Sequence, residues 1–445
     1  MAAAKLRQLL LPHPRGSLPL GGLRRLRSVG AADLRPARGR STKGSGCAGG
    51  PAAATATAEK KSLLRLKRRT RSASEFDREA YTQNLEWQVG GGRSVGEDGV
   101  AHVPVMLGEV LQVFSQRRLR SFVDCTVGAA GHSSAIIRAH PELQLYVGVD
   151  VDPEALEVAR GRIDAAVEST SEAEERRPRI HMRHGNFRTV KSILGGGITG
   201  VGSGDAVDGT IDGILMDLGM SSMQVNNPKR GFSVIGDGPL DMRMDPQASL
   251  NAEDILNSWP EDEVGQILRE YGEESNWRLL QKKIANARAH GGLHSTVELV
   301  NLVRTTSSKT RGRQGWMKTA IRVFQALRIA VNDELKTLED ALYACFDCLS
   351  SGGRLAVISF HSLEDRIVKQ TFLDIINRDE GNDDAIEFRG HINDDQGKEI
   401  EMWSKRRIEG RNGIILTKRP ITPTEEEEKL NYRCRSAKLR VIQKI

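Results

Sequence analysis

Short apolar runs that end at an acid or a glycine turn alternate with amphipathic segments from about residue 100 onward. The runs LQLYVGVD and TIDGILMD are apolar almost throughout, as strands buried on both faces of a parallel sheet are. The segment PEALEVARGRIDAAVE repeats apolar residues at helical spacing and begins with a proline suited to a first helical turn. Repeated strand–helix units predict an α/β fold, with a doubly wound, mostly parallel sheet and helices on both faces.

About one hundred residues interrupt this alternation after the fourth expected strand. They include NAEDILNSW, EDEVGQILREYG, ESNWRLLQKKIANARA and TVELVNLVRTT, which are helical in pattern. Alternation resumes with the helical segment NDELKTLEDALYACFDCL and the buried strand SGGRLAVISF, and a capping box of Ser362 and Asp365 is expected to begin the next helix. We therefore expect residues 95–224 and 319–445 to form the sheet domain, with residues 225–318 as an inserted all-helical domain.

The net charge of +7 conceals two different regions. Residues 1–73 hold 17 Lys and Arg against Asp33 and Glu59, so the remaining chain is mildly acidic. A mildly acidic body does not attract a polyanion over its whole surface. A polyanion would therefore have to bind at local basic stretches. Residues 1–70 are rich in Arg, Leu and small residues and almost free of acid, which indicates a mitochondrial presequence and a location in the mitochondrial matrix. A disordered nucleic-acid-binding arm is the alternative.

Two broad classes of protein are disfavoured. No apolar run reaches the roughly 18 residues that a membrane span needs, so we expect no membrane association. The five cysteines are scattered and odd in number, which argues against a disulfide framework. Cys345 and Cys348 have CxxC spacing within a helical pattern and no second pair, so a packed helix face is favoured over zinc or redox chemistry.

Ligands of doubly wound sheets bind outside the carboxyl ends of the strands. The stretch FVDCTVGAAGHSSAII supplies a small-residue turn there, with Gly128 and Gly131 at a helix N-terminus. Asp150 ends the second expected strand and can accept hydrogen bonds from both hydroxyls of a ribose, although an acid in an exposed turn is an equal alternative. Asn186 and Phe187 follow the third strand and can lie beside an adenine, with core packing as the alternative for Phe187.

The glycine turn lacks two phosphate-binding signatures. It has no G-K-[ST] sequence, which excludes a triphosphate P-loop. GAAGH supplies two glycines where the dinucleotide fingerprint has three. A nucleoside without phosphates, such as S-adenosylmethionine, demands less of the turn. The residues therefore favour a methyltransferase-like nucleoside site over a nicotinamide-dependent oxidoreductase.

Several strings of the chain resemble the MraW/RsmH-type enzymes: GHSSAI, VGVDVDPEAL, DGILMDLGMSS, RGFSVIGDGPLDMRMD, RVFQALRIAVNDEL and LAVISFHSLEDRIVK. The resemblance spans about residues 100–445, with insertions near residues 168–178 and 196–208. It implies a Rossmann-like methyltransferase sheet and transfer of a methyl group from S-adenosylmethionine to the exocyclic N4 of a cytidine in small-subunit rRNA. With the presequence, it implies a mitochondrial member that acts on mitochondrial small-subunit rRNA or the assembling small subunit. A catalytically idle rRNA-binding assembly factor of the same fold is the alternative, and a homodimer stays open.

The resemblance also implies which residues contact the cofactor. Besides Gly128, they are Ala130, Gly131, His132, Asp150, Phe187, Asp217 and Gln224. The strand-end argument gave no special place to Gln224. The family usually has more glycine where this chain has Ala129 and Ala130, so methyl groups there are expected to narrow the cofactor's approach.

A cytosine N4 amine is a poor nucleophile because its lone pair is delocalised into the ring. Methyl transfer therefore needs in-line placement and an acceptor for the amine proton, and no metal. The sequence DLGM stands where many amino-methyltransferases carry [DNS]-P-P-[YFW], so no aromatic residue is offered there. Asp217 is the first candidate for the acceptor, and Ser359 and His361 are the second, with a structural role for His361 as the alternative. Asp241 and Arg243 are expected to close over the site from the inserted segment.

Contacts to RNA are expected from local basic stretches. Residues 299–332 contain seven Lys and Arg and no acid. Within them, SSKTRGRQGWMK is expected to be a loop on which Arg311, Arg313 and Lys318 bind phosphate and Trp316 stacks a base. The tail NYRCRSAKLRVIQK is a second candidate, and solvated basic loops are the alternative to both.

Overall fold

The computed structural model describes residues 104–115, 118–170, 177–196, 208–306, 312–378 and 407–445. All of them belong to one compact unit, which spans Thr70–Ile445. The segment interpreted as a presequence lies outside the described residues, so that interpretation stays a prediction. None of the described helices combines the length and the apolar character that crossing a membrane requires.

Five parallel strands form the part of the sheet expected from the alternation. They are β1 (Ser121–Asp124), β2 (Leu145–Asp150), β3 (Arg179–His184), β4 (Ile211–Asp217) and β5 (Leu349–Ser359). The sheet order is β3-β2-β1-β4-β5-β8-β7-β6. The last strands pair antiparallel and are β6 (Ile408–Glu409), β7 (Gly413–Ile415) and β8 (Lys438–Lys444). The strand order reverses at β1, where such sheets bind ligands, and the predicted fold class is confirmed.

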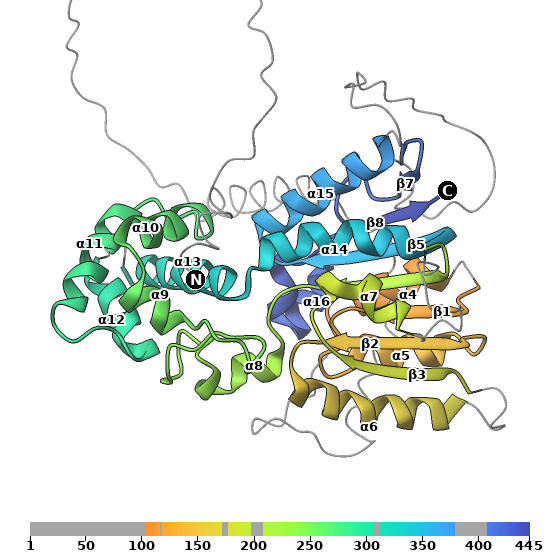
Figure 1. Ribbon diagram of the computed structural model, residues 1–445, viewed down its shortest axis with the longest axis horizontal. Coiled ribbons are helices and arrows are strands. Elements are labelled where there is room, and N and C mark those ends of the chain that lie inside the picture. The colour runs from red at the N-terminus through yellow and green to blue at the C-terminus, as the bar shows by residue number, and fades with distance from the viewer. Residues whose placement is uncertain (1–103, 116–117, 171–176, 197–207, 307–311, 379–406) are drawn as a thin grey trace, which may run out of the picture. The chain divides into compact units, whose positions relative to one another are not determined.

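Helices cover both faces of this sheet (Figure 1). One core cluster includes residues of α7 (Val190–Gly195), α14 (Glu334–Cys348) and α15 (Ser362–Asn377). The other includes residues of α4 (Leu107–Ser115), α5 (Gly131–Ala139) and α6 (Pro153–Thr170). Along β1, Phe122 belongs to the second cluster and Val123 to the first. A strand buried on both faces is apolar throughout for this reason.

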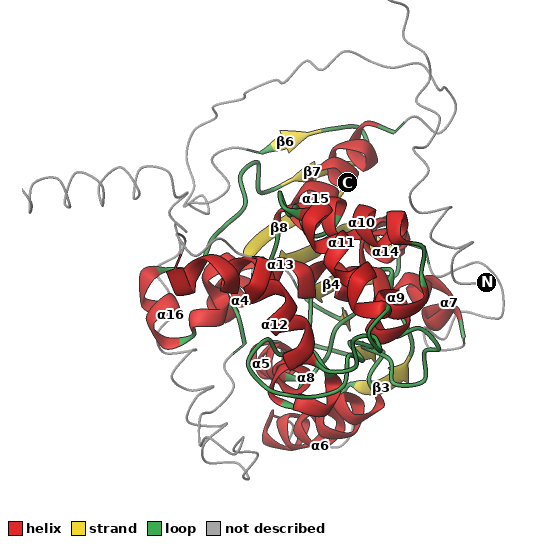
Figure 2. Ribbon diagram, turned by 90° about the vertical axis from the view of Figure 1, so that its left-hand side faces the viewer, coloured by secondary structure: helices red, strands yellow, loops and turns green. Residues whose placement is uncertain are grey.

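The interruption after β4 is helical, as expected (Figure 2). It contains α8 (Ser222–Asn226), α9 (Ala252–Ser258), α10 (Glu261–Glu270), α11 (Trp277–Arg288) and α12 (Thr296–Thr306). Helices α9, α10 and α12 pack on α13 (Gly312–Asn332), which in turn contacts α14. The domain boundary expected at residue 318 falls inside α13, so a single helix connects the insertion to the sheet.

Two local predictions were wrong. Residues 312–318 form the first turns of α13 rather than a loop, and Trp316 continues the helical spacing of Ala320, Phe324 and Leu327 back into this segment. One glycine costs about 1 kcal/mol in a helix interior but does not end the helix. The capping box of α15 begins one residue earlier than expected: the side chain of His361 accepts from the N–H of Glu364, whose carboxylate accepts from the N–H of His361. Nδ1 of the His361 imidazole therefore takes the role of N-cap acceptor that the Ser362 hydroxyl was expected to have.

Candidate active site

The turn after β1 has a left-handed backbone at two positions. Gly128 has a φ of 48°, and Ala130, the N-cap residue of α5, has a φ of 59°. Gly128 donates its N–H to Oδ2 of Asp150 at 2.8 Å, which ties the turn to the end of β2. A β carbon on Gly131 would lie 2.5 Å from Cγ of Pro104, so a side chain at that position would displace the proline ring. The two predicted glycines are therefore needed for different reasons.

Ala130 does not act as its sequence position suggested. Its side chain is fully buried in the core cluster that also contains Val105, Met106 and Ile136. The expectation that a methyl group here narrows the cofactor's approach is therefore wrong for Ala130. The left-handed backbone of an L residue costs about 1–2 kcal/mol, and burial of one methyl group returns about 0.8 kcal/mol.

Asp150 ends β2, as predicted. Its Oδ2 accepts from the N–H of Gly128, and its Oδ1 accepts from the N–H of Asp152 at 2.9 Å. Each carboxylate oxygen has a second lone pair, which suffices for the two hydroxyls of a ribose. Burial raises the pKa of Asp150 in spite of the two N–H donors.

Asp124, at the end of β1, is a buried carboxylate that the sequence analysis did not select. The hydroxyl of Ser133 donates to its Oδ2 at 2.5 Å, and the N–H of Thr126 donates to its Oδ1 at 3.0 Å. Tyr146 donates in turn to the hydroxyl of Ser133 at 2.7 Å. Burial raises the pKa of Asp124 to about 6, and the charge of Asp150 adds to the rise. Asp124 ends β1 as Asp150 ends β2, and this position at the end of a strand is the sequence signal from which Asp124 could have been predicted.

Asp217 ends β4 and faces His132 of α5. Its Oδ2 lies 3.8 Å from Nδ1 of His132, whose Nε2 lies 2.9 Å from the carbonyl oxygen of Val105. Its Oδ1 is buried and has no hydrogen-bond partner among the residues that the structure describes. Burial raises the pKa of Asp217 well above its usual range, and the charge of Asp124 contributes. An unpartnered buried oxygen is costly, so it marks a place for a donor or a cation.

A pocket of about 270 Å³ opens at the carboxyl ends of the strands. Its lining includes residues that follow β1, β2, β3 and β4 directly or closely: Thr126, Val151, Gly185, Asn186, Phe187 and Leu218. Phe187 is thus a predicted site residue that lines the pocket itself. Asn186 lines it too, while its side chain accepts from the N–H of Arg188 at 2.9 Å. Asp150 and Asp217 are each one residue away from a lining residue.

Met244, Asp245 and Ala248 from the insertion form another part of the lining, the insertion wall of the pocket. Nε and Nη2 of Arg243 donate to the two carboxylate oxygens of Asp241 at 2.9 and 2.7 Å. Arg243 also donates to the carbonyl of Ala248 at 2.7 Å. Burial opposes the ionisation of Asp241, but hydrogen bonds from Arg243 outweigh it and hold the pKa of the carboxyl below its usual range. The pair shapes this wall, and its contact with RNA stays a prediction.

Arg230 connects the insertion wall to the end of β2. Its Nη1 donates to Oδ2 of Asp152 at 2.7 Å, and its Nη2 donates to the carbonyls of Arg243 and Met244 at 3.0 and 2.9 Å. Gln224 donates to the same carboxylate oxygen at 3.1 Å and accepts within its own capping box. Both ends of the Gln224 amide therefore serve contacts within the protein. The sequence missed Arg230 because its partner lies 78 residues away.

The second candidates for the proton acceptor have structural contacts. Ser359 donates its hydroxyl to the carbonyl of Lys438, on β8, at 3.4 Å. His361 caps α15, and its Nε2 lies 3.0 Å from Oε1 of Glu364. These contacts agree with the structural alternative for His361, and a catalytic role for either residue stays a prediction.

Glu334, His361 and Glu364 bring possible metal-ligand atoms within 4.8 Å of one another. Arg328, which is also buried, donates to both carboxylate oxygens of Glu334 at 2.8 Å and lies 4.0 Å from Glu364. A guanidinium held by two parallel hydrogen bonds already balances charge in this group. The group is therefore an ion cluster, of which Glu334 and Glu364 line the pocket, rather than an open set of ligands.

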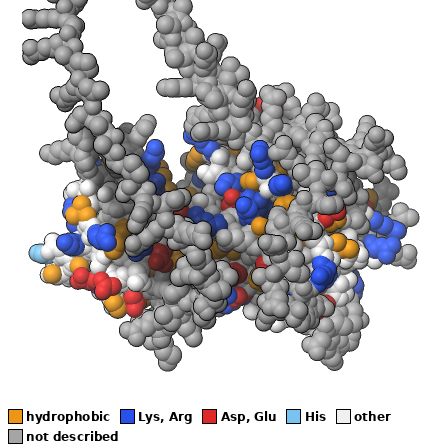
Figure 3. Space-filling view, turned by 90° about the horizontal axis from the view of Figure 1, so that it is seen from above, with side chains coloured by type: hydrophobic (Ala, Val, Ile, Leu, Met, Phe, Trp, Pro, Cys, Tyr) orange, Lys and Arg blue, Asp and Glu red, His pale blue; other side chains and the backbone are white. Residues whose placement is uncertain are grey.

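The predicted RNA-binding residues are only partly described. Arg311 lies outside the described residues, and Arg313 lies in the first turn of α13. Trp316 is half-buried, with the guanidinium of Arg304 5.3 Å from its ring centroid, and Lys318 is exposed. On the face seen in Figure 3, Lys and Arg side chains are interspersed with acidic and apolar ones.

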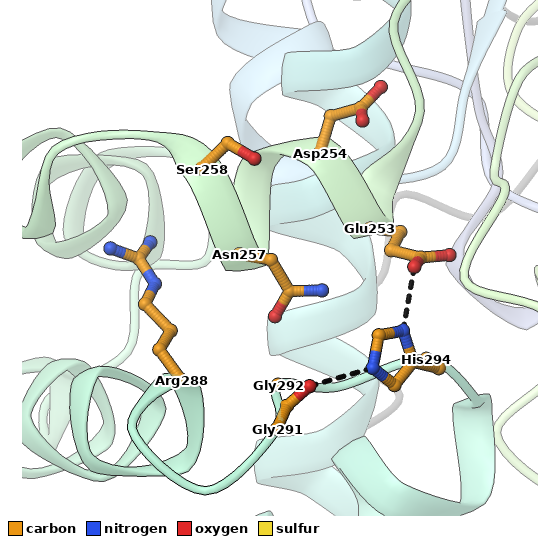
Figure 4. A pocket seen from close by; sticks show the side chains of 8 residues that line it. All are labelled: Glu253, Asp254, Asn257, Ser258, Arg288, Gly291, Gly292 and His294. Atoms are coloured by element: carbon orange, nitrogen blue, oxygen red, sulfur yellow. Dashed lines mark hydrogen bonds and ion pairs between the residues drawn. The ribbon is translucent and has the colours of Figure 1, made fainter.

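A second pocket, of about 230 Å³, is lined only by residues of the insertion (Figure 4). His294 lies 2.7 Å from a carboxylate oxygen of Glu253 and 2.8 Å from the carbonyl of Gly291. Arg288 donates to the carbonyl of Leu256 at 2.6 Å, near the end of α9. These side chains serve the local structure of the insertion, and the two pockets share no lining residue.

Comparison with known proteins assigns the chain to a family. The model of the MraW methylase family matches residues 99–445. A protein of Heliobacterium mobile named ribosomal RNA small subunit methyltransferase H is 40% identical over 344 residues, which cover 77% of this chain and 99% of that protein. The protein of the same name from Pelodictyon phaeoclathratiforme is 38% identical over 352 residues, covering 78% and 96%. With its sheet order, its strand-end carboxylates and these matches, the chain belongs to the MraW methylase family.

Proposed function

We propose that the protein transfers a methyl group from S-adenosylmethionine to the exocyclic N4 of a cytidine in mitochondrial small-subunit rRNA. The observation that carries the proposal is the set of carboxylates at adjacent strand ends, Asp124, Asp150 and Asp217, whose pKa values are raised. Burial disfavours the ionised form of these carboxyls, so a cationic nucleoside that stabilises this form fits the strand ends better than a phosphate-bearing ligand does. The names of the relatives, ribosomal RNA small subunit methyltransferase H, support rRNA as the substrate.

The residues present fit this cofactor, which carries a sulfonium and an ammonium group and no phosphate. Asp150 would hold the ribose hydroxyls, Asn186 and Phe187 would flank the adenine, and the turn Gly128–His132 with Asp217 would hold the methionine part. The unpartnered Oδ1 of Asp217 supports this fit, because a cationic or N–H-bearing ligand removes its cost. When bound, the cofactor supplies an electrophilic methyl group.

Asp217 is also the favoured acceptor for the amine proton. Its carboxylate is unpartnered at one oxygen, and a raised pKa makes it a better base for a group that acidifies during transfer. A hydrogen bond from the N4 amine to the oxygen of Asp217 that the cofactor leaves free would orient the nucleophile. Ser359 and His361 remain weaker candidates, because their side chains already serve β8 and the cap of α15.

We further propose that the protein acts in the mitochondrial matrix. The basic, acid-poor composition of residues 1–70 supports this location. Residues 1–70 fused to a fluorescent protein should carry it into mitochondria, and the chain without them should stay outside. A fusion that accumulates elsewhere would refute the location and leave the reaction untouched.

The test of the reaction is incubation of the full chain with labelled S-adenosylmethionine and mitochondrial small-subunit rRNA, followed by mass spectrometry of the nucleosides. We expect labelled N4-methylcytidine, and its loss in Asp150→Asn and Asp217→Asn. Asp164→Asn is the matched control, since Asp164 is exposed on α6. Label on another nucleoside would refute the cytidine assignment. Cofactor binding without any label would favour the assembly-factor alternative.

A further inference from the structure

An exposed aromatic side chain follows the short helix α16 (Glu425–Leu430). Tyr432 begins η5 (Tyr432–Ser436) and is 76% exposed, and Leu430 is 60% exposed. Cys434, two residues on, is fully buried and anchors the segment to the core. Large apolar side chains exposed side by side on an anchored segment are typical of a binding surface.

Arg433 fixes this segment beside the end of β4. It donates to the hydroxyl of Ser222 at 2.6 Å and to the side-chain oxygen of Asn226 at 2.7 Å. Both partners belong to α8, which begins five residues after Asp217. The same guanidinium lies 5.9 Å from the ring centroid of Tyr432. The ring is therefore held near the loop that follows the candidate proton acceptor.

A second contact ties the segment to the other side of the site. Glu427, which is buried in α16, accepts from the N–H of Met106 at 2.6 Å. The neighbouring residue, Val105, has its carbonyl oxygen 2.9 Å from Nε2 of His132. The segment thus contacts α8, which follows Asp217 in the chain, and Met106, the residue next to the partner of His132.

Cations lie on both sides of the exposed ring in the sequence. Lys429 and Arg435 are exposed, and Arg433 adds a half-buried third charge. The four consecutive acids Glu425–Glu428 lie in the first turn of α16, where the helix dipole favours negative charge, so the cations lie on the C-terminal side of an acidic turn. A stacking ring flanked by phosphate-binding cations is the arrangement with which proteins bind single-stranded nucleic acid.

We propose that Tyr432, Lys429 and Arg435 form a platform that binds the single-stranded RNA next to the target nucleotide, with one base stacked on Tyr432. The inference rests on the proposed function for the position of the target. A base that undergoes chemistry must leave its stack, so its neighbour loses a stacking partner. A ring on the segment that Arg433 ties to α8 would replace that partner.

The test compares variants of the full chain by fluorescence anisotropy with a labelled oligocytidylate of about 12 nucleotides. Tyr432→Ala should weaken binding about 5- to 100-fold, Tyr432→Phe should retain it, and Tyr432→Leu should behave like the alanine variant because it keeps apolar volume without a π face. Lys429→Ala and Arg435→Ala should each lower the dependence of log affinity on log salt by about 0.7. Lys369→Ala, an exposed lysine on α15, is the matched control and should change neither quantity.

The same variants are then assayed for methyl transfer to the rRNA, where Tyr432→Ala should raise KM for RNA with cofactor affinity unchanged. Unaltered RNA affinity in Tyr432→Ala, or no RNA binding by the parent protein, would overturn the platform. Retained binding in Tyr432→Leu would also overturn it, because leucine has no π face on which a base could stack. A parent protein that binds RNA through Tyr432 but transfers no methyl group would refute the proposed function alone.

Discussion

Asp124→Asn should stabilise the cofactor-free protein near neutral pH and lose this advantage in acid. Asp124 is 2% exposed, and burial raises its pKa from 3.8 to about 6. A shift of roughly two units corresponds to about 3 kcal/mol. Because the folded-state pKa is the higher one, the protonated carboxyl contributes stability that is fully present below the unfolded pKa and is lost as pH rises through about 6. Asparagine does not ionise, so it loses nothing over that range.

The assay is urea unfolding of the parent and the variant at about pH 4.5 and about pH 7.5. Asparagine keeps an oxygen for the N–H of Thr126 and offers an amide to Ser133, so the cost of its altered hydrogen bonds is the same at both pH values. We expect the difference in unfolding free energy to move by about 2 kcal/mol in favour of the variant between them. Asp164→Asn, on the exposed face of α6, should show no such movement. A difference that does not depend on pH would refute the argument that burial controls this carboxyl.

Three further predictions follow from the same site. Arg230→Met should lower the free energy of unfolding by about 3–5 kcal/mol, because it leaves Asp152 buried without its cation. Adding Asp152→Asn should restore much of this loss, and a double variant without recovery would contradict the pairing of the two side chains. Affinity for S-adenosylmethionine should rise with pH between about 5 and 7, because ionised carboxylates attract the cation. Calorimetry in two buffers should detect the protons released on binding, and an affinity that does not change with pH would contradict this prediction. Gly128→Ala should cost about 1–2 kcal/mol in thermal or urea unfolding through its left-handed backbone, whereas an unchanged stability would show that the turn relaxes.

The parts of the site that the sequence predicts are those set by the direction of parallel strands. Asp150 and Asp217 each end an apolar run, and parallel strands bring their carboxyl ends to one edge of the sheet. The turn Gly128–Gly131 and the position of Phe187 after β3 follow from the same rule. None of these inferences required knowledge of a contact between distant segments.

The contacts that need tertiary structure escaped prediction. The hydrogen bond between Arg230 and Asp152 joins residues that are 78 positions apart, and no periodicity in the sequence indicates it. The left-handed conformation of Ala130 is equally hidden, because alanine normally indicates a helix rather than a helix cap. The loop expected at residues 312–318 is helical, because α13 continues back from Trp316 through a polar, glycine-containing turn that has no apolar spacing of its own. Long-range partners and strained backbone are therefore where reasoning from the sequence ends.

The active site differs from the second pocket in the free-energy cost of the residues that form it, rather than in the volume of its cavity. At the ends of β1 and β4, Asp124 and Asp217 are carboxylates whose burial opposes their charge, and Ala130 adopts a conformation that suits glycine. In the insertion pocket, by contrast, His294 and Arg288 hydrogen-bond to nearby backbone carbonyls, and no lining side chain there is among the buried unpartnered atoms of the described residues. A protein keeps unfavourable groups where a ligand offsets them. Because burial opposes the ionisation of the two carboxyls, a ligand that brings positive charge, as S-adenosylmethionine does, offsets part of their cost.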